Sequence, residues 1–171
     1  MKSKYKKIFL VLGLLMACHS RPADSAEPLA PTFSLRDING ELFTLSEHRG
    51  KIIIINFWAT WCNPCMAELP HLNQIDKDYE DRNVEVVAIS LDAARHASKV
   101  KAYIKSRKYQ FITLLDTDTA VVSQYHPQKS IPYTIILDRE GHIVHTHVGY
   151  ISGVEDTYIQ IIKDMIQNES R

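Results

Sequence analysis

The run KIIIINFW at positions 51–58 constrains the fold of this 171-residue chain more than any other stretch of its sequence. A strand that is apolar at nearly every position must be buried on both faces, as in the centre of an α/β sheet. Two similar runs follow at 84–91 and 133–138, and segments with helical periodicity lie between the three. This alternation predicts a mostly parallel sheet covered by helices on both sides, in a single domain.

The segments around these strands complete the expected order of elements. Apolar residues at spacings of three and four predict a helix from residue 63 to about residue 81, and amphipathic helices at 94–108 and 154–167. Asn39-Gly40 lies between two short strand-like runs and is a strong signal for an N-terminal hairpin. The stretch 142–149 is expected to form an antiparallel edge strand. The order is therefore a hairpin, then β-α-β-α-β-α, then β-β-α.

The N-terminus has the features of an export signal. MKSKYKK is basic, and the apolar stretch at 8–17 is too short to span a bilayer but suits a signal peptide. It ends in LMAC, which resembles a bacterial lipobox, in which the cysteine carries lipid and becomes the first mature residue. We therefore expect a signal peptide at 1–17, a lipidated Cys18 with a tether at 18–31, and the folded domain at 32–171. The alternatives are a core helix at 8–17, or an ordinary signal peptide in which Cys18 is incidental.

The charge distribution argues against nucleic acid as a partner. The chain has 20 Lys and Arg against 20 Asp and Glu, but four of the lysines lie in the first seven residues. Without residues 1–17, 16 basic residues face 20 acidic ones, so the mature body is mildly acidic. A mildly acidic body does not attract polyanions such as nucleic acid.

Cys62 and Cys65 form a Cys-x-x-Cys motif that permits three interpretations: a zinc site, a structural staple or a redox switch. A structural zinc site needs four ligands, and the sequence has no second cysteine pair. A staple across so short a loop removes little entropy from the unfolded chain. The redox interpretation fits best, because a buried strand ends at Trp58 and a helix begins near Cys62. A helix N-terminus stabilises a thiolate, so Cys62 is the expected attacking sulfur and Cys65 the resolving one.

His145 and His147 lie on one face of the expected edge strand, at a spacing that can bind metal. No third ligand lies near them in the sequence, so an exposed edge position without metal is the favoured interpretation. We expect neither a metal nor another cofactor.

Two stretches carry a resemblance to a known family. WATWCNPC at 58–65 and IPYT at 131–134 resemble the thioredoxin-like proteins, and more narrowly the TlpA/ResA group of membrane-anchored, extracytoplasmic thiol-disulfide oxidoreductases. The resemblance extends over about residues 31–168. It implies a thioredoxin fold, an α/β architecture with a central mixed sheet flanked by helices, an N-terminal β-hairpin and a βα-type insertion.

The resemblance also implies roles for individual residues. Pro132 would form a cis peptide bond beside the disulfide and keep metal away from the thiols, while the backbone of Ile131 would pair with an extended substrate. Asn56 replaces the buried Asp of cytosolic thioredoxins. Glu68 matches a Glu of the TlpA/ResA group, and it would shuttle the proton that Cys65 must lose. A solvated Glu68 on the helix surface is the alternative.

The residues beside the cysteines are expected to meet the substrate. Trp61, Asn63 and Pro64 would form a docking surface together with Ile131, whereas Trp58 is expected in the core. The Asn63-Pro64 pair also sets the local geometry of the motif and hence its reduction potential. The candidate catalytic residues are therefore Cys62, Cys65, Glu68 and Pro132.

The implied function is the reduction of disulfides in exported proteins, with electrons from a membrane thiol-transfer protein. Apocytochrome c is a familiar substrate in the group, but nothing in this sequence selects it. A peroxidase of the peroxiredoxin type would need Thr or Ser three residues before its cysteine, where this chain has Ala59. A copper carrier is the other alternative, although such carriers generally have three residues between the cysteines. The lipid anchor implies an extracytoplasmic protein facing the periplasm, and His19 in place of Asp after Cys18 favours the outer membrane.

Overall fold

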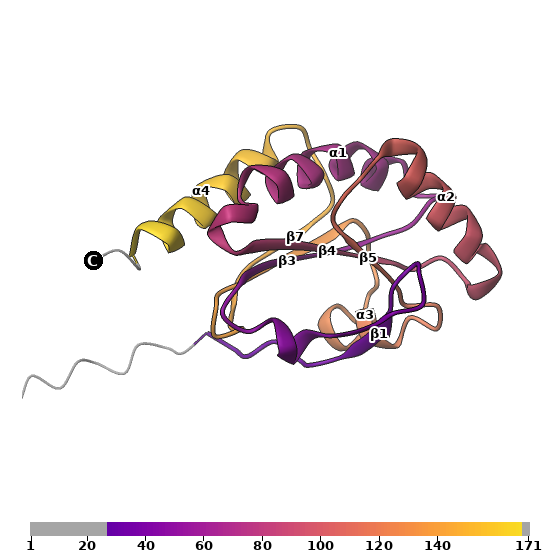
Figure 1. The fold of residues 1–171 in the computed structure, drawn as a ribbon, viewed down its shortest axis with the longest axis horizontal. Coiled ribbons are helices and arrows are strands. Elements are labelled where there is room, and N and C mark those ends of the chain that lie inside the picture. Colours follow the sequence, from indigo (N-terminus) through magenta and orange to yellow (C-terminus); the bar gives the residue numbers. More distant parts are fainter. Residues whose placement is uncertain (1–26, 169–171) are drawn as a thin grey trace, which may run out of the picture.

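The strand β3 (Ile52–Trp58) lies at the centre of a five-stranded sheet in the computed structural model, which describes residues 27–168 (Figure 1). All seven of its residues are buried, as the run KIIIINFW predicts. It pairs in parallel with β4 (Val84–Ser90) and antiparallel with β6 (Tyr133–Leu137). Beyond these, β5 (Ile112–Leu115) continues the parallel side, and β7 (Ile143–Val148) is an antiparallel edge strand. The mixed sheet implied by the family resemblance is therefore confirmed.

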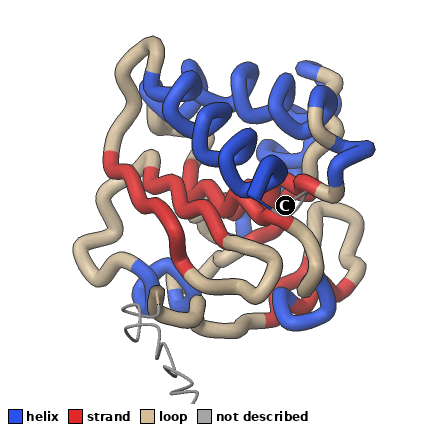
Figure 2. Tube along the Cα trace, turned by 90° about the vertical axis from the view of Figure 1, so that its left-hand side faces the viewer, coloured by secondary structure: helices blue, strands red, loops and turns tan. Residues whose placement is uncertain are grey.

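Helices cover both faces of this sheet (Figures 1 and 2). One face carries α1 (Asn63–Asp78), α2 (Ala97–Arg107) and α4 (Val154–Asn168), and the other carries α3 (Ala120–Tyr125) and the hairpin of β1 (Ser34–Arg36) and β2 (Leu42–Thr44). Successive side chains of a strand point to opposite faces. Ile54 and Trp58 therefore pack under α1 and α4, while Ile55 and Phe57 pack toward the hairpin. This alternation places Asn56 on the α1 side.

Two boundaries differ from the expected ones. α1 ends at Asp78 and not near residue 81, because a 3-10 turn follows and Asn83, with a φ of 54°, turns the chain into β4. At the N-terminus, the carbonyl of Pro28 accepts the N–H of Ile143 (2.9 Å), and Ala30 is buried. The packed domain thus begins a few residues before position 32, within the segment expected to be tether.

The membrane-related expectations concern residues outside the described range. The signal peptide at 1–17, the lipidated Cys18 and most of the tether all precede residue 27. Within residues 27–168, no helix combines the length and the apolar character that crossing a bilayer requires.

Candidate functional site

The end of β3 places Cys62 at the start of α1. The carbonyl of Trp58, the last residue of β3, accepts the N–H of Leu91 (2.8 Å), and the chain then turns toward Cys62. Cys62 is the N-cap of α1. Pro64 follows in the first turn, where a proline is tolerated because its missing N–H would have no helical partner. The strand-to-helix transition expected at this motif is confirmed.

Cys62 and Cys65 are joined by a disulfide bond, with their Cα atoms 5.3 Å apart. The backbone N–H of Cys65 donates a hydrogen bond to Cys62 Sγ (3.2 Å). Cys62 is 6% exposed, whereas Cys65 has no exposed surface. The N–H groups and the dipole at the start of α1 favour negative charge on Cys62 when the bond opens. A molecule approaching from solvent therefore meets the sulfur of Cys62 first.

Asp92 holds the loop that precedes Cys62. Its carboxylate accepts the backbone N–H of Thr60 (2.8 Å) and the Thr60 hydroxyl (2.7 Å). The hydroxyl of Ser90, at the end of β4, donates to the same carboxylate (2.9 Å). Asp92 is 1% exposed, so these bonds form away from water. Asp92 was not among the predicted site residues, although its position directly after a buried parallel strand is a signal in the sequence.

The second motif of the family resemblance lies against the disulfide. The Ile131–Pro132 peptide bond is cis, and the carbonyl oxygen of Ile131 is 3.8 Å from Cys62 Sγ. The N–H of Gly149, just after β7, donates to the carbonyl of Pro132 (2.7 Å). The segments near residues 62, 132 and 149 therefore meet at one end of the strands β3, β6 and β7.

Exposed apolar and polar residues surround this edge. Trp61 is 64% exposed, and Asn63 and Pro64 are exposed beside it, whereas Trp58 is buried as expected. Val148 and Ile151, on either side of the Gly149 contact, are 50% and 74% exposed. These two residues were not predicted, because nothing in the pattern of an edge strand indicates that its end lies beside the cysteines.

Glu68 is fully buried on the inner face of α1, one turn after Cys65. Its Oε1 accepts the hydroxyls of Thr134 (2.9 Å) and Tyr158 (3.2 Å), and its Oε2 accepts Nδ2 of Asn56 (3.0 Å). Burial raises the pKa of Glu68 above its usual value, although the three hydrogen bonds oppose this effect. The solvated alternative for Glu68 is therefore wrong.

Tyr158, on α4, connects this carboxyl group to the two histidines of β7. The ring centroids of His145 and His147 lie 6.0 and 6.3 Å from that of Tyr158, and their Nε2 atoms are buried. The expected edge position is confirmed, but the two side chains are half-buried and not exposed, because α4 covers this face of the strand. Burial, together with the neighbouring His147, lowers the pKa of His145. Among residues 27–168, no three His, Cys, Asp or Glu side chains are grouped so that they could hold a metal ion.

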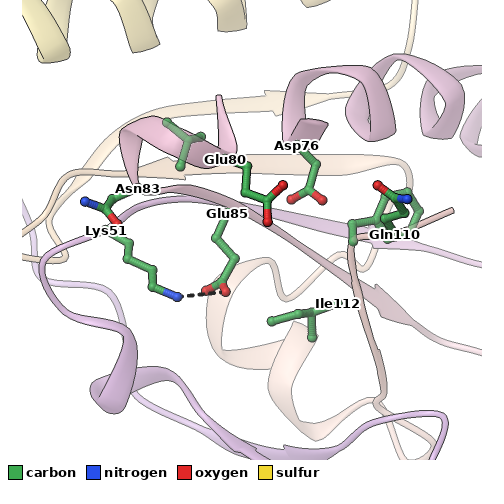
Figure 3. Close-up of a pocket in the computed structure, with 9 residues that line it drawn as sticks. Lys51, Asp76, Glu80, Asn83, Glu85, Gln110 and Ile112 are labelled. Carbon is green, nitrogen blue, oxygen red and sulfur yellow. Dashed lines mark hydrogen bonds and ion pairs between the residues drawn. The ribbon is translucent and has the colours of Figure 1, made fainter. Parts of the chain in front are cut away.

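A separate surface pocket of ≈ 240 Å³ lies at the opposite end of β3 and β4 (Figure 3). Its walls include Lys51 and the carboxylates of Asp76, Glu80 and Glu85. Lys51 Nζ forms an ion pair with Glu85 Oε1 (3.0 Å). Burial, with the charges of Glu85 and Glu80, raises the pKa of Asp76. No cysteine lines this pocket, so it is not part of the redox site.

Fold and site together define the class of protein. On this sheet, a disulfide that closes over the first turn of α1 beside a cis-proline is suited to thiol-disulfide exchange. Comparison with known proteins agrees, because residues 27–146 match the AhpC/TSA family. The chain belongs to this thioredoxin-like family.

Individual relatives narrow the class. The chain is 37% identical to the thioredoxin-like protein YneN of Bacillus subtilis (strain 168) over 127 residues, which are 74% of this chain and 73% of that protein. It is 35% identical to the thiol-disulfide oxidoreductase ResA of the same strain over 136 residues, 78% of this chain and 74% of ResA. The expected enzyme class is thereby confirmed: the chain is a thiol-disulfide oxidoreductase with similarity to ResA.

Solved structures show the same fold. A thiol:disulfide interchange protein of the thioredoxin family from Chlorobium tepidum TLS matches with a TM-score of 0.72 and 27% identity, over 84% of this chain and 99% of that one. The exposed lipoprotein thioredoxin of Streptococcus pneumoniae strain TIGR4 matches with a TM-score of 0.65 and 27% identity, over 78% and 99% of the two chains.

The raised pKa of Glu68 predicts a specific pH dependence of stability. Because the pKa of Glu68 is higher in the folded than in the unfolded chain, its protonation contributes to the free energy of unfolding. This contribution is fully present below about pH 4.3, the unfolded value, and is lost as the pH rises through the folded pKa. Glu68→Gln should escape this loss, so its free energy of unfolding should gain on that of the wild type from about pH 4 toward pH 8. Denaturant unfolding of the oxidised proteins at several pH values measures this. Glu41→Gln, at an exposed position, is the control, and parallel pH curves for wild type and Glu68→Gln would contradict the expectation.

Proposed function

We propose that this protein reduces disulfide bonds of exported proteins. The thiolate of Cys62 attacks one sulfur of a substrate disulfide, forming a mixed disulfide, and the other substrate sulfur leaves as a thiolate. The thiolate of Cys65 then attacks Cys62 Sγ, which releases the second substrate sulfur and closes the Cys62–Cys65 bond. Two electrons pass to the substrate, and a membrane thiol-transfer protein restores the dithiol. One observation carries this proposal: the Cys62 sulfur lies at the start of α1, where it accepts a hydrogen bond from the N–H of Cys65. Cys62 is also the more exposed of the two cysteines.

Glu68 is assigned the proton transfer in this cycle. Cys65 must lose a proton before it can attack, and it is buried away from water. Glu68 lies one turn along the same helix, and burial raises its pKa so that it can hold a proton nearer neutral pH. The geometry also supports this role, because three hydrogen bonds hold the carboxyl group of Glu68 in one place.

The substrate is proposed to dock along the edge formed by the cis-proline loop. The backbone of Ile131 would pair with an extended segment of the substrate, as strands add to an exposed edge. The neighbours of Cys62 in the sequence, Trp61, Asn63 and Pro64, provide further exposed surface beside it. Pro132 beside the disulfide would keep metal ions from the reduced thiols. Apocytochrome c is one exported thiol protein that such a site could accept.

Single-cysteine variants test the order of the two sulfurs. With dithiothreitol as electron source and insulin as substrate, Cys62→Ser should reduce insulin no faster than the uncatalysed reaction. After the dithiothreitol has been removed, reduced Cys65→Ser should still attack insulin but lack the resolving sulfur, so a mixed disulfide should accumulate and be visible on a non-reducing gel. A mixed disulfide trapped by Cys62→Ser and absent from Cys65→Ser would reverse the assigned roles.

The reduction potential of the Cys62–Cys65 pair tests the direction of electron flow. A reductant should have a potential near or below that of thioredoxin, ~−270 mV, and would need an electron donor. Equilibration with glutathione and dithiothreitol buffers, followed by mass spectrometry of alkylated thiols, measures it. A value near that of DsbA, ~−120 mV, would make the protein an oxidant of newly exported thiols and overturn the reductase proposal.

The protein is further proposed to be a lipoprotein anchored through Cys18, facing the periplasm from the outer membrane. Its similarity to an exposed lipoprotein thioredoxin and to ResA supports an extracytoplasmic location. In cells expressing the full chain, labelled palmitate should enter the wild type, and Cys18→Ala should carry no label and leave the membrane fraction. Cys65→Ala is the matched control for loss of a cysteine. Label that persists in Cys18→Ala would contradict lipidation at this residue.

A further inference from the structure

Two pairs of side chains connect α1 and α4, which lie side by side on one face of the sheet (Figures 1 and 2). The inner pair is Glu68 with Tyr158, both without exposed surface, with 3.2 Å between Glu68 Oε1 and the Tyr158 hydroxyl. The outer pair is His71 with Glu155, with 3.3 Å between His71 Nδ1 and Glu155 Oε1. On each helix the two members are three residues apart, which is about one turn, so the pairs lie next to each other.

The outer pair forms a partly enclosed cluster and not an ordinary surface ion pair. The side chain of Glu155 is 14% exposed and that of His71 is 46% exposed. The N–H of Gly153 donates to Glu155 Oε2 (3.0 Å), and the ring of Tyr150 lies 6.0 Å from that of His71. Although burial opposes it, hydrogen bonds from the backbone and the charge of His71 hold the pKa of Glu155 below its usual value. Glu155 therefore carries a negative charge near the buried pair.

The charge of Glu155 acts on the inner pair. Burial has the largest effect on the pKa of Glu68 and raises it, the hydrogen bonds from Thr134, Tyr158 and Asn56 lower it, and the negative charge of Glu155 adds a smaller rise. Both Glu68 and Glu155 raise the pKa of Tyr158, again after the larger effect of burial. Such interactions remain strong where water is excluded. When its imidazole carries a second proton, His71 places a positive charge beside Glu155.

We propose that His71 and Glu155 control how readily Glu68 takes up a proton, and thereby make thiol-disulfide exchange at Cys62–Cys65 respond to pH. This inference rests on the proposed role of Glu68. His71 and Glu155 touch no reacting atom, so they are positioning residues that act through Glu68. With His71 protonated, the charge of Glu155 is compensated and Glu68 ionises more easily; with His71 neutral, Glu68 retains its proton to higher pH.

Several other polar and titratable groups surround Glu68. Asn56 on β3 and Thr134 on β6 do not titrate, and Tyr158 on α4 and Tyr150 after β7 have raised pKa values through burial and neighbouring carboxylates. The rings of His145 and His147, on β7, lie 6.0 and 6.3 Å from the ring of Tyr158. The substitution of His147 therefore provides a matched control for the loss of a histidine.

The two outer residues should have opposite effects, which separates electrostatic control from a merely structural role. Glu155→Gln removes the negative charge, so Glu68 should ionise at lower pH. His71→Gln leaves Glu155 without its positive partner, so Glu68 should ionise at higher pH. Each change should be ~0.5 pH unit or more, as expected for a nearby charge. Loosening of the α1–α4 contact would instead move Glu68 in the same direction in both variants.

The titration of Glu68 is measured directly by NMR of the oxidised protein with ¹³C-labelled glutamate, the Glu68 carboxyl signal being assigned by its loss in Glu68→Gln. We expect opposite shifts in Glu155→Gln and His71→Gln, and a smaller change in His147→Gln. An unchanged titration in both outer variants, shifts in the same direction, or a larger effect of His147→Gln would overturn the inference. Because His71 is half-exposed, its variant keeps the test valid even if Glu155→Gln fails to fold.

A second measurement separates this inference from the proposed function. The reduction potential of Cys62–Cys65 is followed from pH 5 to 9, and its pH profile should shift in opposite directions in the two outer variants. In a Glu68→Gln background the same substitutions should have no effect. If the wild type does not reduce insulin, the proposed function fails while the NMR titration still judges the electrostatic coupling. If insulin is reduced but the outer variants leave the profile unchanged, only the inference fails.

Discussion

The burial of β3 on both faces is the constraint on which the rest of the structure depends. A strand without a solvent face has to be covered by helices on one side and by the hairpin and α3 on the other. Its chain reaches the surface only at the end, after Trp58, and α1 must then turn back over the sheet. Cys62, the N-cap of α1, therefore keeps a small exposed surface, while Cys65, one turn later, is packed into the core without any. Reactivity at one sulfur and protection of the other follow from the same geometry.

The same geometry buries the ionisable carboxyl group of Glu68, and the side chain opposite it, Asn56, has to be compatible with a buried carboxylate. Glu68 points from α1 onto β3, where it meets the amide of Asn56 at 3.0 Å. A carboxylate in place of Asn56 would bring two like charges to this distance, and both could not ionise without a large free-energy cost. The neutral amide instead donates a hydrogen bond to Glu68. Asn56 and Glu68, which the sequence shows as one departure and one match to thioredoxin-like proteins, are thus parts of one arrangement.

The sequence predicts what depends on local pattern, and less of what depends on contacts between distant segments. The run at 51–58, the helix start at Cys62 and the hairpin at Asn39-Gly40 all follow from composition and spacing, and the structure has them. Pro132 was identified only through the family resemblance, since spacing alone does not indicate that it lies near Cys62. The contact of His147 with Tyr158 and the hydrogen bonds from Thr60 to Asp92 cannot be predicted without knowing which helix or loop packs against which strand. Such tertiary contacts leave no periodic signal.

The buried carboxylate of Glu68 belongs to a helix and not to a strand of the sheet. A carboxylate on β3 would be surrounded by the sheet, whose packing leaves little freedom for substitution. Glu68 instead lies between the sheet and α4, and the adjacent turn of both helices already reaches solvent at His71 and Glu155. Residues at that surface can change the electrostatic environment of Glu68 without altering β3, the cis-proline loop or the cysteine pair. The proton affinity of the site can therefore vary independently of the geometry that positions the two sulfurs.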